Sequence, residues 1–317
     1  MKLQQISSND VLTQQVVNAM ISRSTALEFA EFYSMTGNAE YRRKAATASG
    51  GQFRALDSDY SDNAVSPDYA NPALKILGDK VQVDRAHERR GMDVASERAR
   101  QLLSFAQNLG KQFQNYFFNG DSTTPEQFDG LIKLVPVSQK ITPDDPISVV
   151  LGNTDTAKTS QQAFLEAINQ LIQKVDGGAQ VLFMNSYVLS RLTTVAREFI
   201  QWQPNTFGTL IPFYNGIPLR DAGYDKDGNM ILPQTETLGD ANDCSSIFAV
   251  RFGEAVDLSI ATNIGVEVKD LGLVGSHYTH TVEFDAAPVL LNNKAVAQLS
   301  GIEILSVIPE PEPEPEP

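Results

Sequence analysis

The spacing of apolar residues changes along the chain, and each spacing predicts a different element. In residues 9–33 the apolar side chains fall on one helical face, and Asn9 or Asp10 can cap the helix. Residues 93–117 carry the strongest helical pattern, with Asp93 as the cap. Its apolar positions recur at spacings of three and four and are Ala95, Ala99, Leu102, Leu103, Ala106, Leu109, Phe113 and Tyr116. These spacings predict a long helix with one buried face.

The stretch between these helices, residues 45–91, is short of large apolar residues over most of its length and rich in Gly, Ser, Asp and Ala. Near its end two valines, Val81 and Val83, alternate with polar residues, which is the period of a strand with one dry face. A segment with so little apolar mass cannot form its own core, and an isolated hairpin is marginal in water. The pattern therefore predicts an extended, hairpin-like arm that needs a partner to lie on.

Helices and strands alternate in the rest of the chain without a regular period. Helices are predicted at 160–175 and from the cap Asn185 onward, with a short buried strand at 180–184 between them. Further strands are predicted near residues 215–220, 246–251, 265–269, 277–284 and 294–300. This mixture predicts an α+β fold. The last residues, 309–317, repeat Pro and Glu and are predicted to be extended and disordered.

Residues 117–130, FFNGDSTTPEQFDG, hold acids, hydroxyls and glycines and raise the question of a ligand loop. Gly120 fits a left-handed helix C-cap, and the run from Thr124 to Gln127 fits the start of a short helix that Gly130 ends. The Gly-x-x-x-x-Gly-Lys-Ser/Thr spacing of a phosphate loop does not occur in the sequence. Backbone hydrogen bonding explains these polar residues, so we interpret the stretch as a join between two elements.

Composition limits the class of protein. The chain has 317 residues, 42% of them hydrophobic and 20% charged, as in a globular protein with one large or two modest domains. No apolar run reaches the length of a membrane span, and no export signal is visible. The one cysteine, Cys244, excludes an internal disulfide and fits a reducing compartment.

The net charge of −14 is unevenly distributed. Residues 1–118 carry 14 Lys and Arg against 13 Asp and Glu, whereas residues 119–317 carry 11 against 26. The even mixture in the first part suits ion pairing between subunits. The acidic second part repels nucleic acid rather than gripping it, although the same charge also serves solubility.

Residues Asp225–Glu236, DKDGNMILPQTE, echo a calcium loop, with acids and an amide at ligand positions. Met230 replaces the glycine that the sharp turn needs, Pro233 lies inside the loop, and the flanks do not read as paired helices. A β-hairpin with its turn at Asp227 and Gly228 is the simpler interpretation. We therefore predict that this loop does not depend on calcium.

Other residues that often carry chemistry do not form a recognisable set. His277 and His280 are three apart in a predicted strand, so they point to opposite faces and cannot share a metal. His87 lies among arginines, which disfavours a metal cation, and Cys244 has no basic neighbour that would activate its thiol. No Gly-x-Ser-x-Gly elbow occurs, and Trp202 fits a core at least as well as a stacking platform. We assign no catalytic, cofactor-binding or metal-binding residue and predict that the protein is not an enzyme.

Two stretches of the sequence resemble a known family. The run LKILGDKVQVDRAHERRG, then the predicted helix at 93–117, then FFNGDSTTPEQFDGL, resembles the major capsid proteins of tailed bacteriophages with the Hong Kong 97-like fold. The match covers roughly residues 74–131. The order of the predicted elements extends the resemblance more weakly over almost the whole chain.

The resemblance implies a domain map. In that map residues 1–44 form an N-terminal arm, 45–91 an extended β-hairpin loop, 92–149 and 271–308 a peripheral domain built on the spine helix 93–117, 150–270 an axial domain, and 309–317 the tail. Some members of the family form Lys–Asn crosslinks. Lys75 and Lys80 lie in the corresponding region, but no crosslinking motif accompanies them and no crosslinking role is carried over.

The resemblance also implies a function and partners. The chain would be the major capsid protein of a tailed phage, assembling in the host cytoplasm into the hexamers and pentamers of an icosahedral shell. In the virion this shell would enclose double-stranded DNA without sequence-specific contact. Because only a short stretch precedes residue 45, a fused scaffold is not expected, and a separate scaffolding protein and a portal are the implied partners, with no membrane.

Two other classes of protein are open at this point. An encapsulin-like compartment shell shares the fold and would package cargo enzymes instead of DNA. An α+β enzyme is the third class, and no residues in the sequence support it. Neighbouring genes would separate a phage capsid from an encapsulin.

Overall fold

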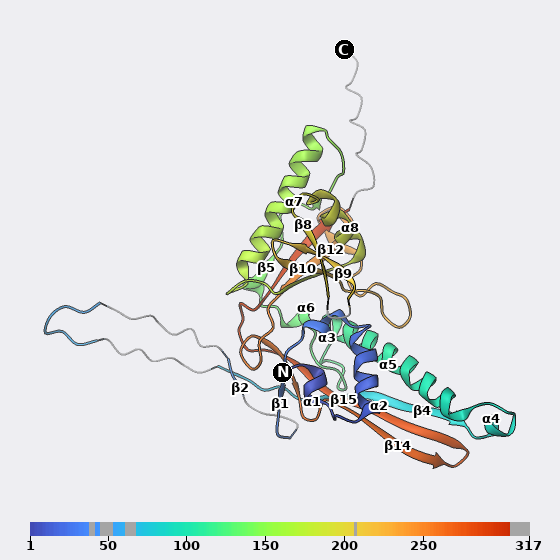
Figure 1. Ribbon diagram of the computed structural model, residues 1–317. Helices are drawn as coiled ribbons and strands as arrows, with labels where there is room; N and C mark the ends of the chain where they lie inside the picture. The colour runs from blue at the N-terminus through green and yellow to red at the C-terminus, as the bar shows by residue number, and fades with distance from the viewer. Residues whose placement is uncertain (38–41, 45–52, 61–67, 206–207, 305–317) are drawn as a thin grey trace.

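The structure is a computed structural model that describes residues 1–37, 42–44, 53–60, 68–205 and 208–304. Two sheets form the body, each with helices packed against it, and two long projections leave the body in different directions (Figure 1). The mixture of helices and strands confirms the α+β class. The predicted disorder of residues 309–317 falls outside the described residues.

The N-terminal segment packs against the spine helix. It contains α1 (Leu3–Ile6), α2 (Val11–Ile21), α3 (Thr25–Phe29) and β1 (Phe32–Ser34). Asp10 caps α2 because its carboxylate accepts hydrogen bonds from the amides of Leu12 and Thr13, at 3.1 and 3.3 Å. The helical prediction for residues 9–33 is confirmed for α2 and α3. It is wrong at the end, because β1 pairs in parallel with β13 (Leu258–Thr262).

The spine helix is α5 (Val94–Asn119), and it follows the sequence prediction closely. Asp93 caps it by accepting hydrogen bonds from the amides of Ala95 and Ser96. Its buried positions are Leu102, Ala106, Leu109, Gly110, Phe113, Gln114, Phe117 and Phe118. Gly110 allows close packing on α2, since a Cβ there would lie 2.4 Å from the carbonyl oxygen of Met20. The apolar period of the sequence thus builds the centre of the larger core.

The first sheet is organised around β15 (His277–Leu290). The first part of β15 pairs antiparallel with β4 (Lys75–Asp84) on one side and with β14 (Val266–Val274) on the other. Its last part pairs with β13. Beyond the body these strands continue as a tongue, which we define as β4, β14, the first part of β15, α4 (Ala86–Arg89) and the N-terminal part of α5 (Figure 1).

The partner of β4 corrects the predicted hairpin. A strand at Val81 and Val83 was expected, and it exists, but it pairs with β15 instead of with the arm. The reason is burial, because both valines are under 10% exposed and Val81 belongs to the core that α5 and β15 share. A strand with a dry face lies where a core can cover that face.

The second sheet has nine strands in the order β5-β16-β12-β7-β10-β9-β8, with β6 also paired to β16 and β11 to β12. Their bounds are β5 Lys140–Ile141, β6 Ile147–Ser148, β7 Val181–Met184, β8 Ile200–Pro204, β9 Leu210–Tyr214, β10 Ile217–Asp221, β11 Glu236–Leu238, β12 Ala241–Val250 and β16 Val296–Glu303. All four residues of β7 are buried, as predicted.

Two helices, α7 (Asp155–Lys174) and α8 (Ser186–Val195), form a second core with this sheet. Both were predicted, and Asn185 caps α8 by accepting a hydrogen bond from the amide of Val188 at 2.8 Å. Each sheet contains strands from both the predicted peripheral domain (92–149 and 271–308) and the predicted axial domain (150–270). β16 lies in the nine-stranded sheet, and β13 lies beside β15. The domain boundaries themselves stay a prediction.

The join at residues 117–130 has different local geometry from the one its sequence predicts. Gly120 ends α5 with φ −54° and ψ 146°, which is not left-handed. No helix begins at Thr124, and Gly130 precedes α6 (Leu131–Leu134) instead of ending a helix. Tight packing explains both glycines, because a Cβ on Gly130 would lie 2.6 Å from the amide nitrogen of Gly120.

Candidate assembly surface

The arm comprises residues 42–70, of which the structure describes 42–44, 53–60 and 68–70. At its root, β2 (Arg42–Arg43) pairs antiparallel with β3 (Tyr69–Ala70). Its far end, residues 53–60, is called the arm tip here and lies well away from the body (Figure 1). No residue of the arm tip is buried, and Phe53 and Leu56 are 110% and 90% exposed. Large apolar side chains this exposed indicate a surface that one subunit leaves incomplete.

The arm tip has a defined local shape. The amide and hydroxyl of Ser58 both donate hydrogen bonds to the carbonyl oxygen of Ala55, at 3.3 and 2.8 Å. The guanidinium of Arg54 donates to the carbonyl oxygen of Ser58 at 3.1 Å and lies 5.4 Å from the ring centre of Tyr60. Asp57 takes a left-handed conformation with φ 65°, which Asp tolerates better than most residues. The tip therefore presents its apolar side chains on a preformed turn.

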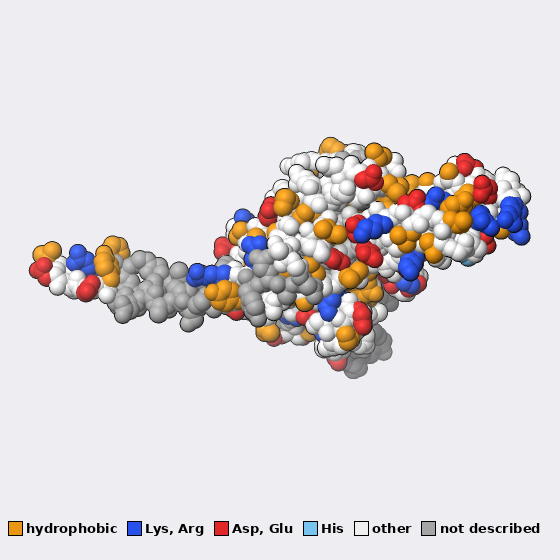
Figure 2. Space-filling model, turned by 90° about the horizontal axis from the view of Figure 1, so that it is seen from below, with side chains coloured by type: hydrophobic (Ala, Val, Ile, Leu, Met, Phe, Trp, Pro, Cys, Tyr) orange, Lys and Arg blue, Asp and Glu red, His pale blue; other side chains and the backbone are white. Residues whose placement is uncertain are grey.

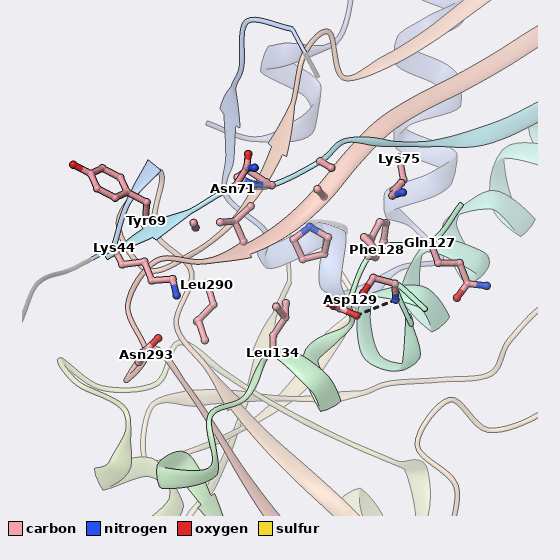
Figure 3. Close-up of a pocket in the computed structure, with 17 residues that line it drawn as sticks. Lys44, Tyr69, Asn71, Lys75, Gln127, Phe128, Asp129, Leu134, Leu290 and Asn293 are labelled. Carbon is pink, nitrogen blue, oxygen red and sulfur yellow. Dashed lines mark hydrogen bonds between the residues drawn. The ribbon is translucent and has the colours of Figure 1, made fainter. Parts of the chain in front are cut away.

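A groove lies at the root of the arm, and we call it the root groove (Figure 3). It has a volume of about 510 Å³ and is bounded by β3, the start of β4, the join before α6 and the end of β15. Apolar side chains such as Phe128, Leu134 and Leu290 line it. Lys44 and Lys75 lie on opposite sides of it (Figure 3). The groove is thus lined by polar and apolar groups together, and its Lys44 ammonium is paired with the carboxylate of Asp68 at 2.9 Å.

The polar residues of the join are engaged with one another beside this groove. Asp121 accepts hydrogen bonds from the amide and hydroxyl of Thr123 and from the ammonium of Lys133. The Lys133 contact, followed by those of Thr123, lowers the pKa of the Asp121 carboxyl from 3.8 to about 2. The Asp129 carboxylate accepts from the amide of Ser122 at 2.9 Å. These contacts give the cluster a structural explanation, as the join interpretation proposes.

A polar cluster ties the start of α5 to the tongue. Arg98 donates hydrogen bonds to both carboxylate oxygens of Asp270, each at 2.7 Å. The same guanidinium lies 3.3 Å from Nε2 of His280 and 5.1 Å from the ring centre of Tyr278. Burial, followed by the charge of Arg98, lowers the pKa of His280, while Asp270 acts in the opposite direction. The fold therefore favours a neutral His280 that can accept a hydrogen bond from Arg98.

Sequence reasoning missed this cluster because its members are far apart in the chain. Arg98 is separated from Asp270 by 172 positions and from His280 by 182. The two histidines His277 and His280 lie in different environments. His280 is buried, whereas His277 is only half-buried and contacts the neighbouring Ser276 hydroxyl at 3.0 Å.

The end of the tongue carries three arginines together with the acids Asp84, Glu88 and Asp93. Arg85, Arg89 and Arg90 flank or belong to α4, and all three are exposed. Figure 2 shows the Lys and Arg side chains gathered at this end of the molecule. His87 lies among them and is half-buried. The end of the tongue therefore mixes both signs of charge.

In the loop that resembles a calcium site, groups of the loop itself hydrogen-bond to the carboxylate of Asp225. Oδ1 of Asp225 accepts hydrogen bonds from the amides of Asp227 and Asn229, both at 2.9 Å, and Oδ2 accepts from the Asn229 side chain at 3.2 Å. These bonds, the Asn229 amide first, lower the pKa of Asp225. Gly228 is left-handed and a single bridge joins Tyr224 to Met230, so the predicted hairpin is reduced to a turn. Among the described residues, no group of three His, Cys, Asp or Glu could hold a metal ion.

Cys244 is buried, and burial, followed by the charges of nearby acids, raises the pKa of its thiol, so it is a poor nucleophile. Trp202 lies on β8 and is 59% exposed, so the core interpretation is wrong for this residue. Lys75 donates a hydrogen bond to the carbonyl oxygen of Pro125, and Lys80 is exposed on β4. In the part of the chain that is described, no helix is long and apolar enough to cross a membrane.

Solved structures match this chain, whereas no protein-family model and no curated protein does. The holo-SrpI encapsulin complex from Synechococcus elongatus PCC 7942 matches with a TM-score of 0.59 and 13% identity, over 88% of this chain and 87% of that chain. The capsid of the native GTA particle matches with a TM-score of 0.58 and 11% identity, over 93% of both chains. The capsid of Myoviridae phage XM1 matches with a TM-score of 0.53 and 12% identity, over 87% of this chain and 90% of that chain.

Sequence identities this low support a shared fold and nothing more. The similarity extends over nearly the whole of each chain. The chain therefore has the shell-protein fold of phage capsids and encapsulins, the Hong Kong 97-like fold that its sequence resembles.

Proposed function

We propose that this chain is the major capsid protein of a tailed phage and that it assembles into an icosahedral shell around packaged double-stranded DNA. The observation that carries the proposal is the fold shared with the GTA capsid over 93% of both chains. The exposed arm supports it, because a projection with no core of its own is completed by a neighbouring subunit. Hexamers and pentamers of the chain would close the shell, and its place would be the virion after assembly in the host cytoplasm.

The proposal assigns a role to each part of the chain. The arm acts as the outer part of the extended loop of residues 45–91. In this assignment α5 and β15 belong to the peripheral domain of 92–149 and 271–308, and residues 150–270 form most of the axial domain. A separate scaffolding protein and a portal are the proposed partners. No enzymatic activity is proposed.

Packaged DNA would be enclosed and not gripped. Residues 119–317 carry 26 acidic against 11 basic residues, which favours weak contact with a polyanion. We expect the unassembled subunit to bind DNA with a Kd of about 10⁻⁴ M or weaker at physiological salt. Tight, sequence-selective binding in a mobility-shift assay would contradict the proposal.

An encapsulin-like compartment shell is the second candidate, and one observation favours it. The encapsulin complex matches with a TM-score of 0.59, as high as the 0.58 of the GTA capsid. The two candidates differ in contents, since one encloses nucleic acid and the other encloses proteins.

Electron microscopy of particles purified from the native host, followed by analysis of their contents, tests both candidates. The proposal predicts closed shells that hold nuclease-protected double-stranded DNA. Shells that hold a protein cargo and no DNA would favour the encapsulin candidate. A chain that stays monomeric at all concentrations, with its scaffolding protein present, would contradict both.

A further inference from the structure

A groove lined by no acidic residue lies between β5 and the last turns of α7, and we call it the two-lysine groove. Gln170 and Lys174 lie on one face of α7, because they are four positions apart. The acid Glu166, one turn before Gln170, accepts a hydrogen bond from the Gln170 amide at 3.4 Å but does not line the groove. The groove has a volume of about 450 Å³ and is lined by Lys140, Ile141, Thr142, Gln170, Gln173 and Lys174.

The two ammonium groups of this groove have no carboxylate partner in the described part of the chain. Nζ of Lys140 donates a hydrogen bond to the carbonyl oxygen of Ile132 at 3.2 Å, and Nζ of Lys174 donates one to that of Ser138 at 2.8 Å. An ammonium group has three N–H donors, so each lysine keeps two after its carbonyl contact. The groove therefore suits an occupant that carries carboxylates.

The chain has a segment of this chemistry that the proposed function does not use. Residues 309–317 alternate proline with four glutamates, which are Glu310, Glu312, Glu314 and Glu316. Alternating prolines predict a stiff, extended backbone, and a stiff segment loses little conformational entropy when it lies on a surface. The sequence thus presents a row of carboxylates at a low entropic cost of binding.

We propose that the two-lysine groove binds the glutamates of the chain's own Pro-Glu tail, residues 309–317. In the bound state carboxylates of the tail accept hydrogen bonds from the ammonium groups of Lys140 and Lys174. The side-chain amides of Gln170 and Gln173 offer further donors beside them. The contact lies within one subunit, so it does not depend on the proposed shell.

The end of β16 puts the tail within reach of the groove. β16 ends at Glu303, and Gln298, five positions earlier, pairs with Lys140. Five residues of a strand span about 17 Å. Residues 304–316 span about 40 Å when they are extended at ~3.1 Å per residue. The tail is therefore long enough to turn back beside β16 and place its last glutamates in the groove.

Tethering favours the chain's own tail over any other acidic segment. Ion pairs between exposed lysines and glutamates are individually weak, and a free peptide also loses its translational freedom on binding. A tail attached close to the groove acts at an effective concentration in the millimolar range, so a few weak pairs are enough to hold it. Because these pairs are exposed to solvent, salt should release the tail.

Zero-length crosslinking of the free, full-length subunit at low salt tests the contact. A carbodiimide joins a carboxylate to an amine only where the two groups meet, and mass spectrometry of a tryptic digest identifies each pair. No Lys or Arg follows Lys294, so all links from the tail appear on one C-terminal peptide. Lys158 is the matched control, because it is exposed on the same helix. It lies nearer the end of β16, since Ser160 contacts Ser148 and Ser148 contacts Glu303.

We expect links from the tail to Lys140 and Lys174 at about ten times the yield of links to Lys158. In about 1 M salt this excess should disappear, because the Debye length falls to ~3 Å. Equal yields at low salt would overturn the proposal. The same reaction on an equal mixture of ¹⁴N- and ¹⁵N-labelled chains identifies the donor of the tail. Links between unlike chains in half of the products would assign the tail to a second copy and would also overturn it.

Protection of the two amines from acetylation gives a second test. The variant Glu310→Gln, Glu312→Gln, Glu314→Gln, Glu316→Gln keeps the length of the tail and removes its charge. In this variant Lys140 and Lys174 should be acetylated about threefold faster than in the wild type, while the rate at Lys158 stays the same. Circular dichroism checks that the variant is folded. Unchanged rates at all three lysines, or an equal increase at all three, would contradict a tail held in the groove.

Discussion

The arm and the tongue both project from the body, but only the tongue is covered by its own chain. The tongue is a three-stranded antiparallel sheet with α5 beside it, and Val81 and Val83 of β4 are buried. The described part of the arm has two paired residues on each side at its root and no buried side chain at its tip. A projection of the first kind is stable within one subunit, whereas one of the second kind gains its stability from contacts between subunits.

The largest expected effect separates folding from assembly. Replacing residues 46–66 with a short Gly-Ser turn keeps the β2–β3 pair and should leave helix content and melting temperature nearly unchanged, because the cost of loop closure varies only slowly with length. The same change should abolish closed shells. Sedimentation and circular dichroism measure the two outcomes. If the variant subunit were unfolded, the arm would be part of the core. If the variant formed normal shells, the arm would have no role in assembly.

A pair of phenylalanines tests the same contrast at single positions. Phe113 of α5 is fully buried and contacts Phe117, Phe128 and Phe284, so Phe113→Ala should lower the free energy of unfolding by about 3–5 kcal/mol. Phe53→Ala is the matched control and should change it by less than about 0.5 kcal/mol, because the side chain is exposed in the subunit. Denaturant titration of unassembled protein gives both values. Equal losses would contradict the contrast.

The polar cluster of the tongue predicts a pH dependence. His280 has a lowered pKa in the folded subunit, so the unfolded chain binds a proton more readily than the folded one. The stability that the neutral ring contributes is present above the ordinary His pKa of about 6.5 and is lost as the pH falls below it. We therefore expect the free energy of unfolding to fall as the pH is lowered through this range.

His280→Gln should flatten this part of the stability profile, and His277→Gln is the control that should leave it unchanged. The charged groups next to His280 are Arg98 of α5 and Asp270 of β14, while its partner on β4 is the apolar Val81. Unfolding titrations between pH 5 and 8 provide the comparison. A wild-type profile identical to that of His280→Gln would show that the cluster does not titrate in this range.

The smallest expected effect concerns calcium. Asp225→Ala should remove an Asx-type turn and cost little stability, and neither this variant nor the wild type should respond to added calcium. The carboxylate of Asp225 is already held by the amides of its own loop. Isothermal titration calorimetry is the measurement. Micromolar calcium binding that Asp225→Ala abolishes would contradict the interpretation of this loop.

Local signals made part of the fold predictable. The period of α5, its cap Asp93 and the cap Asn185 of α8 are properties of short stretches, and the structure contains all three. The pairing of β4 with β15 joins segments about two hundred positions apart, and no local pattern specifies it. Gly120 and Gly130 show a second limit. Their presence suggested caps, but the reason for them is the close approach of the two backbones.

The candidate assembly surface was likewise only partly predictable from the sequence. The exposed arm could be predicted because its low apolar content is visible in the sequence. The root groove could not, since β3, the join before α6 and the end of β15 meet only in the fold. Arg98, Asp270 and His280 likewise have no relation in the sequence that would bring them together.

The central claim is that a neighbouring subunit covers the arm, and limited proteolysis before and after assembly tests it most directly. In the free subunit a protease should cut first at the arm tip, residues 53–60, where every residue is at least largely exposed. In closed shells that cut should be slower by about tenfold or more, while exposed sites elsewhere are cut at unchanged rates. Equal cleavage of the arm tip in free subunits and in shells would contradict the account.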